Sequence, residues 1–171
     1  MRLVIISLIA SSLLSATLPV SDIKVSGLTG VNLQANQATW GVDIEFDTLL
    51  LPPMITASYY RTSGSTVTNQ GNTDFTTTES QVGLRWRYPI AIGSIVYGSG
   101  VSTIQSRVTQ APGPNLTADA LGVYTQIGLI TRPQNNWSFG VMATYSSAQQ
   151  VLDKYTESGG LYLMSSLGIY F

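Results

Sequence analysis

Apolar and polar residues alternate with a period of two along most of the chain beyond its N-terminal segment. Between Trp40 and Phe46, every second residue is apolar and the residues between are glycine or acidic. A period of two sends successive side chains to opposite faces of a β-strand. Prolines and runs of Thr, Ser, Asn and Gly interrupt the alternation and separate the strands. The pattern predicts eight strands, over residues 23–35, 40–48, 54–62, 80–88, 92–105, 119–131, 137–146 and 160–171.

The last predicted strand ends the chain on an aromatic residue. One of its faces is apolar, and the other carries Tyr, Ser and Gly. In a membrane-spanning β-barrel the last strand pairs with the first, and its apolar face contacts lipid. We therefore predict that this strand closes a barrel, with an outward face formed by Leu161, Leu163, Leu167, Ile169 and Phe171.

The connections between the predicted strands alternate in length. Those after the second, fourth and sixth strands are short, whereas three polar segments, 63–79, 106–118 and 147–159, are predicted to be long loops. Outer-membrane barrels have short periplasmic turns and longer extracellular loops. The alternation and the even strand count therefore predict that both termini lie in the periplasm.

The composition favours a membrane barrel over a soluble one. Charged residues make up 10% of the chain, against roughly 25% in soluble domains. Beyond the N-terminal segment no apolar run approaches the roughly 18 residues of a membrane-spanning helix, which leaves a closed barrel as the way to cross a bilayer. A soluble lipocalin-like barrel is the rival fold, but the polar faces here carry mainly Gly, Ser, Thr, Asn and Gln. The predicted fold class is all-β, an eight-stranded antiparallel transmembrane β-barrel.

Residues 1–16 have the features of a secretory signal peptide. An arginine precedes the apolar run 3–14, and small residues follow it, as in segments that direct export. Cleavage near Ala16 would leave a single domain over 17–171. The chain has no Cys, which excludes a disulfide framework and a lipid-modified Cys anchor.

Six charged residues are predicted to point into the barrel. Charges in the narrow interior of an eight-stranded barrel must be paired, because an unpaired buried charge costs several kcal/mol. Counted from the strand tops, Glu45 matches Arg85 in depth and Asp47 matches Arg87. Three acids and three bases sum to zero, as a closed plug requires. The predicted lumenal cluster consists of Lys24, Asp43, Glu45, Asp47, Arg85 and Arg87.

The alternating carboxylates of this cluster also permit other interpretations. Successive inward residues of a strand lie roughly 6–7 Å apart. Paired carboxylates of this kind can act as an acid/base pair, bind a hard cation, or gate an ion or solute path. The structural plug is favoured over these, and the remaining lumen is predicted to be filled by Gln81, Gln105, Tyr124, Gln126, Met142, Tyr162 and Tyr170.

Outward aromatic residues are predicted to gather near the strand ends. Aromatic rings favour the headgroup depth of a bilayer and form belts at both interfaces of a membrane barrel. The predicted girdle consists of Trp40, Phe46, Tyr59, Trp86, Tyr88, Trp137, Phe139, Tyr145 and Phe171.

The chain has no His. It therefore lacks the usual general base near neutral pH and the commonest metal ligand, so that a Ser–His–Asp triad and a His-ligated zinc site are excluded. We expect no catalytic residue, metal site or cofactor. The net charge of −1 gives no indication of nucleic-acid binding.

The signal segment, the eight strands, the alternating connections and the terminal Phe171 together resemble the small outer-membrane barrels typified by the OmpA transmembrane domain and OmpX. The resemblance implies residence in the bacterial outer membrane, with outer-membrane lipid and, during insertion, the barrel-assembly machinery as partners. It leaves several functions open, because one fold serves many. We expect a non-enzymatic structural or scaffold protein whose loops or outer wall contact another envelope protein. The alternatives are a narrow pore for small or hydrophobic solutes and a hydrolase or acyltransferase that works without His.

Overall fold

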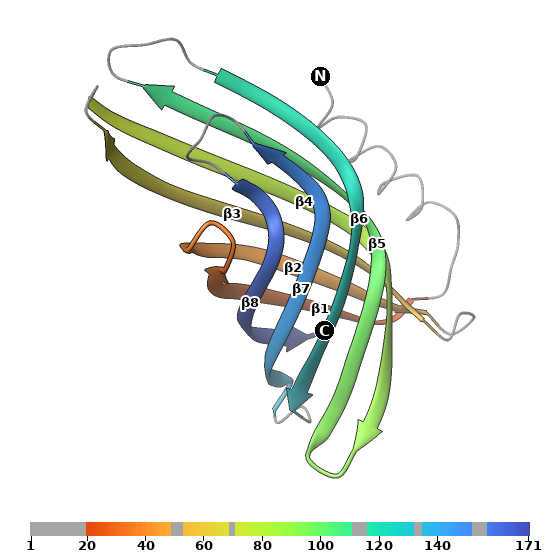
Figure 1. Ribbon diagram of the computed structural model, residues 1–171. Helices are drawn as coiled ribbons and strands as arrows, with labels where there is room; N and C mark the ends of the chain where they lie inside the picture. The colour runs from red at the N-terminus through yellow and green to blue at the C-terminus, as the bar shows by residue number, and fades with distance from the viewer. Residues whose placement is uncertain (1–19, 49–52, 69–70, 111–115, 132–134, 152–156) are drawn as a thin grey trace.

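The computed structural model describes residues 20–48, 53–68, 71–110, 116–131, 135–151 and 157–171, and the predicted signal segment lies outside them. Eight strands form a closed antiparallel barrel in which each strand pairs with its neighbour in sequence and β8 pairs with β1 (Figure 1). The predicted number and antiparallel arrangement of the strands are confirmed. The strands are β1 (Val20–Asn32), β2 (Gln37–Thr48), β3 (Met54–Thr68), β4 (Gly71–Ile90), β5 (Gly93–Gln110), β6 (Leu116–Thr131), β7 (Trp137–Val151) and β8 (Glu157–Tyr170).

The two ends of the barrel differ. We call the end where β1 begins and β8 finishes the closing end, and the other end, where the hairpins β1–β2, β3–β4, β5–β6 and β7–β8 turn, the loop end. No helix in the described residues is long and apolar enough to cross a membrane.

The strands alternate between an apolar exterior and a mainly polar interior. Val123, Ile127 and Val141 are 57–60% exposed on the outside, whereas Gln126 and Thr144 are buried inside. This arrangement is the reverse of a soluble barrel and suits an exterior surrounded by lipid. The predicted assignment of faces is therefore correct for these strands.

Most of the residues predicted to form long loops belong to strands instead. β3 and β4 stay paired as far as Thr68 opposite Gly71, so the segment 63–79 is largely a strand hairpin. The segments 106–118 and 147–159 likewise contribute residues to strands. The prediction treated the loss of apolar alternation as the end of a strand, but backbone pairing needs no apolar face, and β-branched Thr favours strands. β3 to β6 consequently extend beyond β1 and β2 at the loop end (Figure 1).

The barrel closes through the pairing of β1 with β8. Their register runs from Lys24 opposite Tyr170 to Asn32 opposite Tyr162. Beyond it, the Phe171 amide donates to the Ile23 carbonyl at 2.9 Å. Of the outward residues predicted for this strand, four are exposed and Ile169 is half-buried; the exposed ones are Leu161, Leu163, Leu167 and Phe171.

A bulge bends the barrel wall between β7 and β8. The register shifts between Ser146 and Gln150, and Gly159 and Gly160 opposite it have φ values of 84° and 78°. Only glycine adopts this region at little cost. The Asn32 side-chain amide donates to the Gly159 carbonyl at 2.9 Å and ties the bulge to β1.

Candidate functional site

Arg85 of β4 lies at the centre of an ion-pair network inside the barrel. Its Nη1 lies 2.6 Å from Asp43 Oδ2 and 2.7 Å from Glu45 Oε1, and its Nη2 donates to Asp43 Oδ1 at 3.1 Å. Nη2 also donates to Gln126 Oε1 at 3.0 Å. The Arg85 side chain is 0% exposed. The two contacts with Asp43 form a bidentate pair, which fixes the plane of the guanidinium group.

Glu45 is shared by three cationic side chains. Lys24 Nζ donates to Glu45 Oε1 at 2.8 Å, where Arg85 also binds, and Arg87 Nη2 donates to Glu45 Oε2. Lys24 and Arg87 also lie near the ring of Tyr170, with Lys24 Nζ 5.7 Å and Arg87 Cζ 5.3 Å from its centroid. Contacts of this kind between a cation and an aromatic ring are attractive.

The network crosses the barrel interior. Because β3 lies between β2 and β4, the pairs that join Arg85 to Asp43 and Glu45 pass over β3 on the inside of the wall. The contact of Arg87 of β4 with the Tyr170 ring of β8 reaches the opposite side of the barrel. Ser58 of β3 donates to Asp43 Oδ1 at 2.6 Å and completes the contact with the intervening strand. The participating side chains come from β1 (Lys24), β2 (Asp43, Glu45), β3 (Ser58), β4 (Arg85, Arg87), β6 (Gln126) and β8 (Tyr170).

The structure brings together five of the six charged residues predicted for the cluster but leaves Asp47 outside its ion pairs. Within the described part of the chain, Arg87 binds the carboxylate of Glu45, and Arg85 binds those of Asp43 and Glu45. The predicted match of Glu45 with Arg85 is present as an ion pair, whereas the predicted match of Asp47 with Arg87 is wrong. Depth was counted from strand tops that lie elsewhere, since β4 begins at Gly71, and the hydrogen-bonded rows of a barrel are inclined. Without Asp47 the network holds three positive and two negative charges.

Glycines in β4 and β5 make room for the side chains that hold the network in place. A Cβ atom at Gly98 would lie 2.6 Å from Nε2 of Gln126, and one at Gly83 would overlap the Tyr124 hydroxyl. Tyr124 is buried against these backbones, and its hydroxyl lies 3.3 Å from Thr56 Oγ1. Two glycines of the predicted strand 92–105, Gly98 and Gly100, therefore leave space for Gln126 and Tyr124 of β6.

A second, mostly apolar layer fills the lumen on the loop-end side. The rings of Tyr60 and Tyr162 stack with centroids 5.7 Å apart. They form one buried cluster with Leu28, Met142 and Met164. Met142 and Tyr162 were predicted lumen residues, whereas Tyr60 and Leu28 were missed, because their inward positions interrupt the polar pattern of their strands.

Glu79 is a further inward acid that the sequence analysis placed in a loop. It is 1% exposed within β4, and Gln81 Nε2 donates to its Oε1 at 2.7 Å. Among the described residues no cation pairs with Glu79. The Tyr162 hydroxyl interacts with its carboxylate, but without the geometry of a good hydrogen bond. Strand parity would have identified it, because it shares a face with Gln81 and Arg85. Gln105, in contrast, was predicted inside but is exposed outside.

We expect Glu79→Gln to raise the free energy of unfolding by about 1–3 kcal/mol, because it removes a buried charge and keeps the side-chain shape. Urea titration of the refolded barrel in detergent micelles measures the change. Asp74→Asn, at an exposed position of the same strand, is the control and should have an effect below about 0.5 kcal/mol. A loss of stability in Glu79→Gln would contradict this account of the site.

The predicted girdle aromatics all lie on the outer wall. Tyr88, Phe139 and Phe171 are 61–73% exposed, and Phe46 and Trp86 are half-buried. Trp86 stacks on Tyr97 of β5, with ring centroids 5.3 Å apart, and Tyr97 is an outward aromatic residue that the predicted girdle does not include. The other four residues of the predicted set also face outward, with three of them exposed and one half-buried: Trp40, Tyr59, Trp137 and Tyr145.

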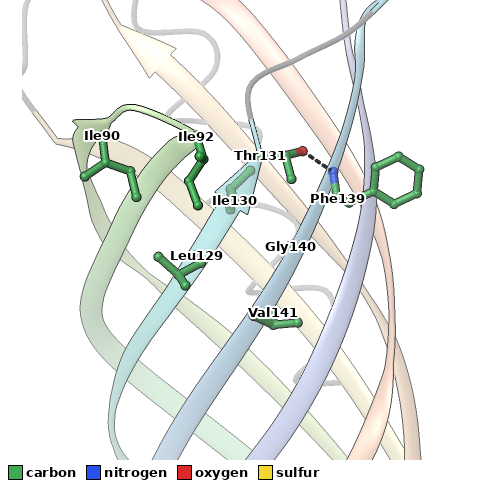
Figure 2. Close-up of a pocket in the computed structure, with 8 residues that line it drawn as sticks. All are labelled: Ile90, Ile92, Leu129, Ile130, Thr131, Phe139, Gly140 and Val141. Carbon is green, nitrogen blue, oxygen red and sulfur yellow. Dashed lines mark hydrogen bonds between the residues drawn. The ribbon is translucent and has the colours of Figure 1, made fainter.

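A depression of about 210 Å³ lies on the outer wall near the closing end. Figure 2 shows the residues that line it. Ile90 and Ile92 line one side, and Leu129 and Val141 line the floor. The pairing of β6 with β7 ends here at Ile130 opposite Gly140. Among the described residues that line the depression, Thr131 alone has a polar side chain. Its hydroxyl oxygen accepts a hydrogen bond from the Phe139 amide at 3.0 Å. Such a surface suits a lipid chain and offers no group for catalysis.

Comparison with known proteins identifies the fold. No protein-family model and no curated protein sequence matches the chain. Among solved structures, Neisserial surface protein A superposes with a TM-score of 0.60 at 12% identity, over 87% of this chain and 93% of that one. The N-terminal β-barrel domain of Pseudomonas aeruginosa OprF gives a TM-score of 0.57 at 10% identity, over 88% and 97% of the two chains.

Ail, the attachment invasion locus protein of Yersinia pestis, is also similar. In its complex with the heparin analogue sucrose octasulfate it gives a TM-score of 0.54 at 14% identity, over 88% of this chain and 95% of that one. At such low identities the similarity concerns the fold. The chain has the fold of the small eight-stranded outer-membrane barrels, as its sequence pattern predicted.

Proposed function

We propose that the chain is a non-enzymatic integral protein of the bacterial outer membrane whose lumen is closed by the ion-pair network. Its role is structural, and its loop end contacts a partner at the cell surface. The observation that carries the closed lumen is the position of Arg85, which is fully buried and held by two carboxylates and the Gln126 amide across the interior.

Closure is supported at two levels of the barrel. The ion-pair network occupies the level of Arg85, and the stacked Tyr60 and Tyr162 occupy a second level toward the loop end. Side chains of this size can fill the interior of an eight-stranded barrel. This filling favours a structural role over a narrow pore, which needs a continuous water path.

The same contacts weigh against an enzyme. Asp43 and Glu45 are the carboxylates that the sequence offered as an acid/base pair, but both are neutralised by bound cations and shielded from water. A general acid or base must exchange its proton with a substrate within hydrogen-bond reach. Neither carboxylate is accessible to a substrate in this arrangement.

The extension of β3 to β6 beyond β1 and β2 supports contact with a partner at the loop end (Figure 1). Its outward residues are polar and exposed, among them Ser63, Arg107 and Thr109. A paired sheet that rises beyond the apolar band presents a more ordered surface than a flexible loop would. Binding residues are frequently displayed in this way on a rigid scaffold.

Single cysteines test the membrane location and the orientation together, because the chain has no Cys of its own. Ser65→Cys places a thiol at an exposed position toward the loop end, and Ala91→Cys places one at an exposed position of the closing end. Intact cells are treated with a membrane-impermeant maleimide. We expect Ser65→Cys to react in intact cells and Ala91→Cys to react only after the outer membrane is permeabilised.

The inverse labelling pattern would overturn the orientation. Labelling of neither variant in intact cells, together with recovery of the protein in a soluble fraction, would overturn the membrane location. The unmodified chain serves as the control for background labelling.

A further inference from the structure

A polar groove of about 640 Å³ lies on the outer wall of β3 to β6, toward the loop end. Two arginines, Arg61 and Arg107, stand on opposite sides of it, and threonine hydroxyls lie between them. Both arginines are exposed. We call this surface the arginine groove, and its polar lining is formed by Arg61, Thr76, Thr78, Gln105, Arg107, Thr117 and Asp119.

The strand register explains how the arginines come to face one site. Arg61 of β3 lies opposite Thr78 of β4, and Arg107 of β5 lies opposite Thr76. The two arginines therefore flank the same stretch of β4 on its two sides. Neighbouring strands are about 4.8 Å apart, so both guanidinium groups can converge on one anion above the threonines.

The arginine groove begins where the apolar exterior ends. On β4 the outward residues change from Leu84 and Val82 to Thr78 and Thr76, and the outward positions of β5 and β6 change in the same way at this level. Arg61 lies over the ring of Trp40, with its Cζ 5.9 Å from the ring centroid. An aromatic ring at the upper limit of an apolar band is typical of the interface with lipid headgroups.

The groove has the chemistry of a phosphate site. Arginine presents a planar fork of donors that matches phosphate oxygens, and hydroxyl groups add further donors. The two arginines outweigh the single carboxylate of Asp119, which accepts a hydrogen bond from Gln105 at 3.2 Å. An anion is therefore preferred over a cation on this surface.

We propose that the arginine groove binds the phosphorylated headgroup of a glycolipid in the surrounding outer leaflet. The inference rests on the proposed location in the outer membrane. The groove is on the lipid-facing side of the wall, so the headgroup can reach it while its acyl chains lie against the apolar residues below. Arg61 and Arg107 bind the phosphate, and Thr76 and Thr78 position it.

The test uses the refolded barrel in nanodiscs of zwitterionic phosphatidylcholine that contain increasing amounts of diphosphorylated lipid A. Fluorescence of Trp40, which lies beside Arg61, follows binding in a variant with the substitutions Trp86→Phe and Trp137→Phe. Arg61→Gln and Arg107→Gln together should weaken binding at least about tenfold, since two charge-assisted contacts are lost. Asp119→Asn should strengthen it, and Thr109→Ala, outside the groove on the same strand face, should leave it unchanged.

Two results would overturn the inference. One is equal binding of lipid A by the unmodified barrel and by the double arginine variant. The other is equal binding of a soluble glucosamine phosphate without acyl chains, which would identify a free phosphosugar as the ligand. The cysteine-labelling experiment, repeated in the double arginine variant, separates the two proposals. Normal labelling without a preference for lipid A refutes this inference alone. Loss of membrane insertion in the unmodified chain refutes the proposed function.

Discussion

Arg85→Ala is expected to lower the free energy of unfolding by about 3–5 kcal/mol, the largest loss among single substitutions in the lumen. The substitution leaves Asp43 without its bidentate partner and Glu45 without one of its three cations. Both carboxylates stay buried, and removing one member of a buried ion pair leaves a charge that the protein cannot solvate. Urea titration in detergent micelles, followed by tryptophan fluorescence, measures the loss.

A double-mutant cycle with Asp43→Ala separates pairing from packing. Because Arg85 and Asp43 share two hydrogen bonds, the double variant should be more stable than the sum of the single losses predicts, by about 1–3 kcal/mol. Strictly additive losses would contradict the pairing. Arg107→Ala, at an exposed position of the outer wall, is the matched control and should cost less than about 1 kcal/mol.

Gly83→Val is expected to destabilise the barrel by about 1–3 kcal/mol, because it overfills the interior beside the ion-pair network. A Cβ at position 83 would overlap the Tyr124 hydroxyl and the Ser99 carbonyl oxygen, and it would lie 2.8 Å from the Gly100 Cα. Two of these three contacts are with backbone, which cannot move without disturbing the pairing of β4 with β5. The same urea titration measures the effect.

Gly27→Val is the matched control for this substitution. Gly27 is exposed on the outer face of β1, and a Cβ there would meet nothing within 4 Å. Its replacement adds the same side chain to a strand of the same barrel without overfilling it. The account predicts an effect within about 0.5 kcal/mol; equal losses at Gly27 and Gly83 would show that the interior at Tyr124 is not tightly packed.

Sequence alternation predicts the barrel and its two faces because successive side chains of a strand point to opposite sides of the wall. Trp40 to Phe46 and the terminal strand illustrate this, since their apolar sides face outward as predicted. The same parity brought Lys24, Asp43, Glu45, Arg85 and Arg87 to the interior. Pairing then follows from the cost of leaving these charges unpaired in a narrow lumen.

Two features of the structure lie beyond this reasoning. Toward the loop end the outward positions of the strands become polar, as at Arg61, Thr76 and Arg107, while Phe75, Ile104 and Val108 are buried inside. The alternation of an apolar outer face with a polar inner face is lost there, and Glu79 was assigned to a loop for that reason. Relative depth across the barrel depends on its inclined rows, so counting matched Glu45 with Arg85 but missed the contacts of Arg85 with Asp43 and of Arg87 with Glu45. The arginine groove depends on the same cross-strand register, which places Arg61 and Arg107 beside one stretch of β4.

The proposed closed lumen implies a rigid interior, which suits a protein whose functional surfaces lie outside it. The network joins residues of β1, β2, β3, β4, β6 and β8, so disturbing it affects most of the wall. The extended β3–β6 sheet is thereby held on a well-packed base. The two proposed interactions, contact with a partner at the loop end and binding of a headgroup in the arginine groove, both involve the exterior.

Single-channel conductance of the refolded mature protein in a planar lipid bilayer tests the closed lumen most directly. The account predicts no discrete openings in the unmodified barrel, because Arg85 and its partners fill the cross-section. Discrete openings whose size or frequency changes in Arg85→Ala would contradict it and would assign to the ion-pair network the role of a gate in a conducting pore.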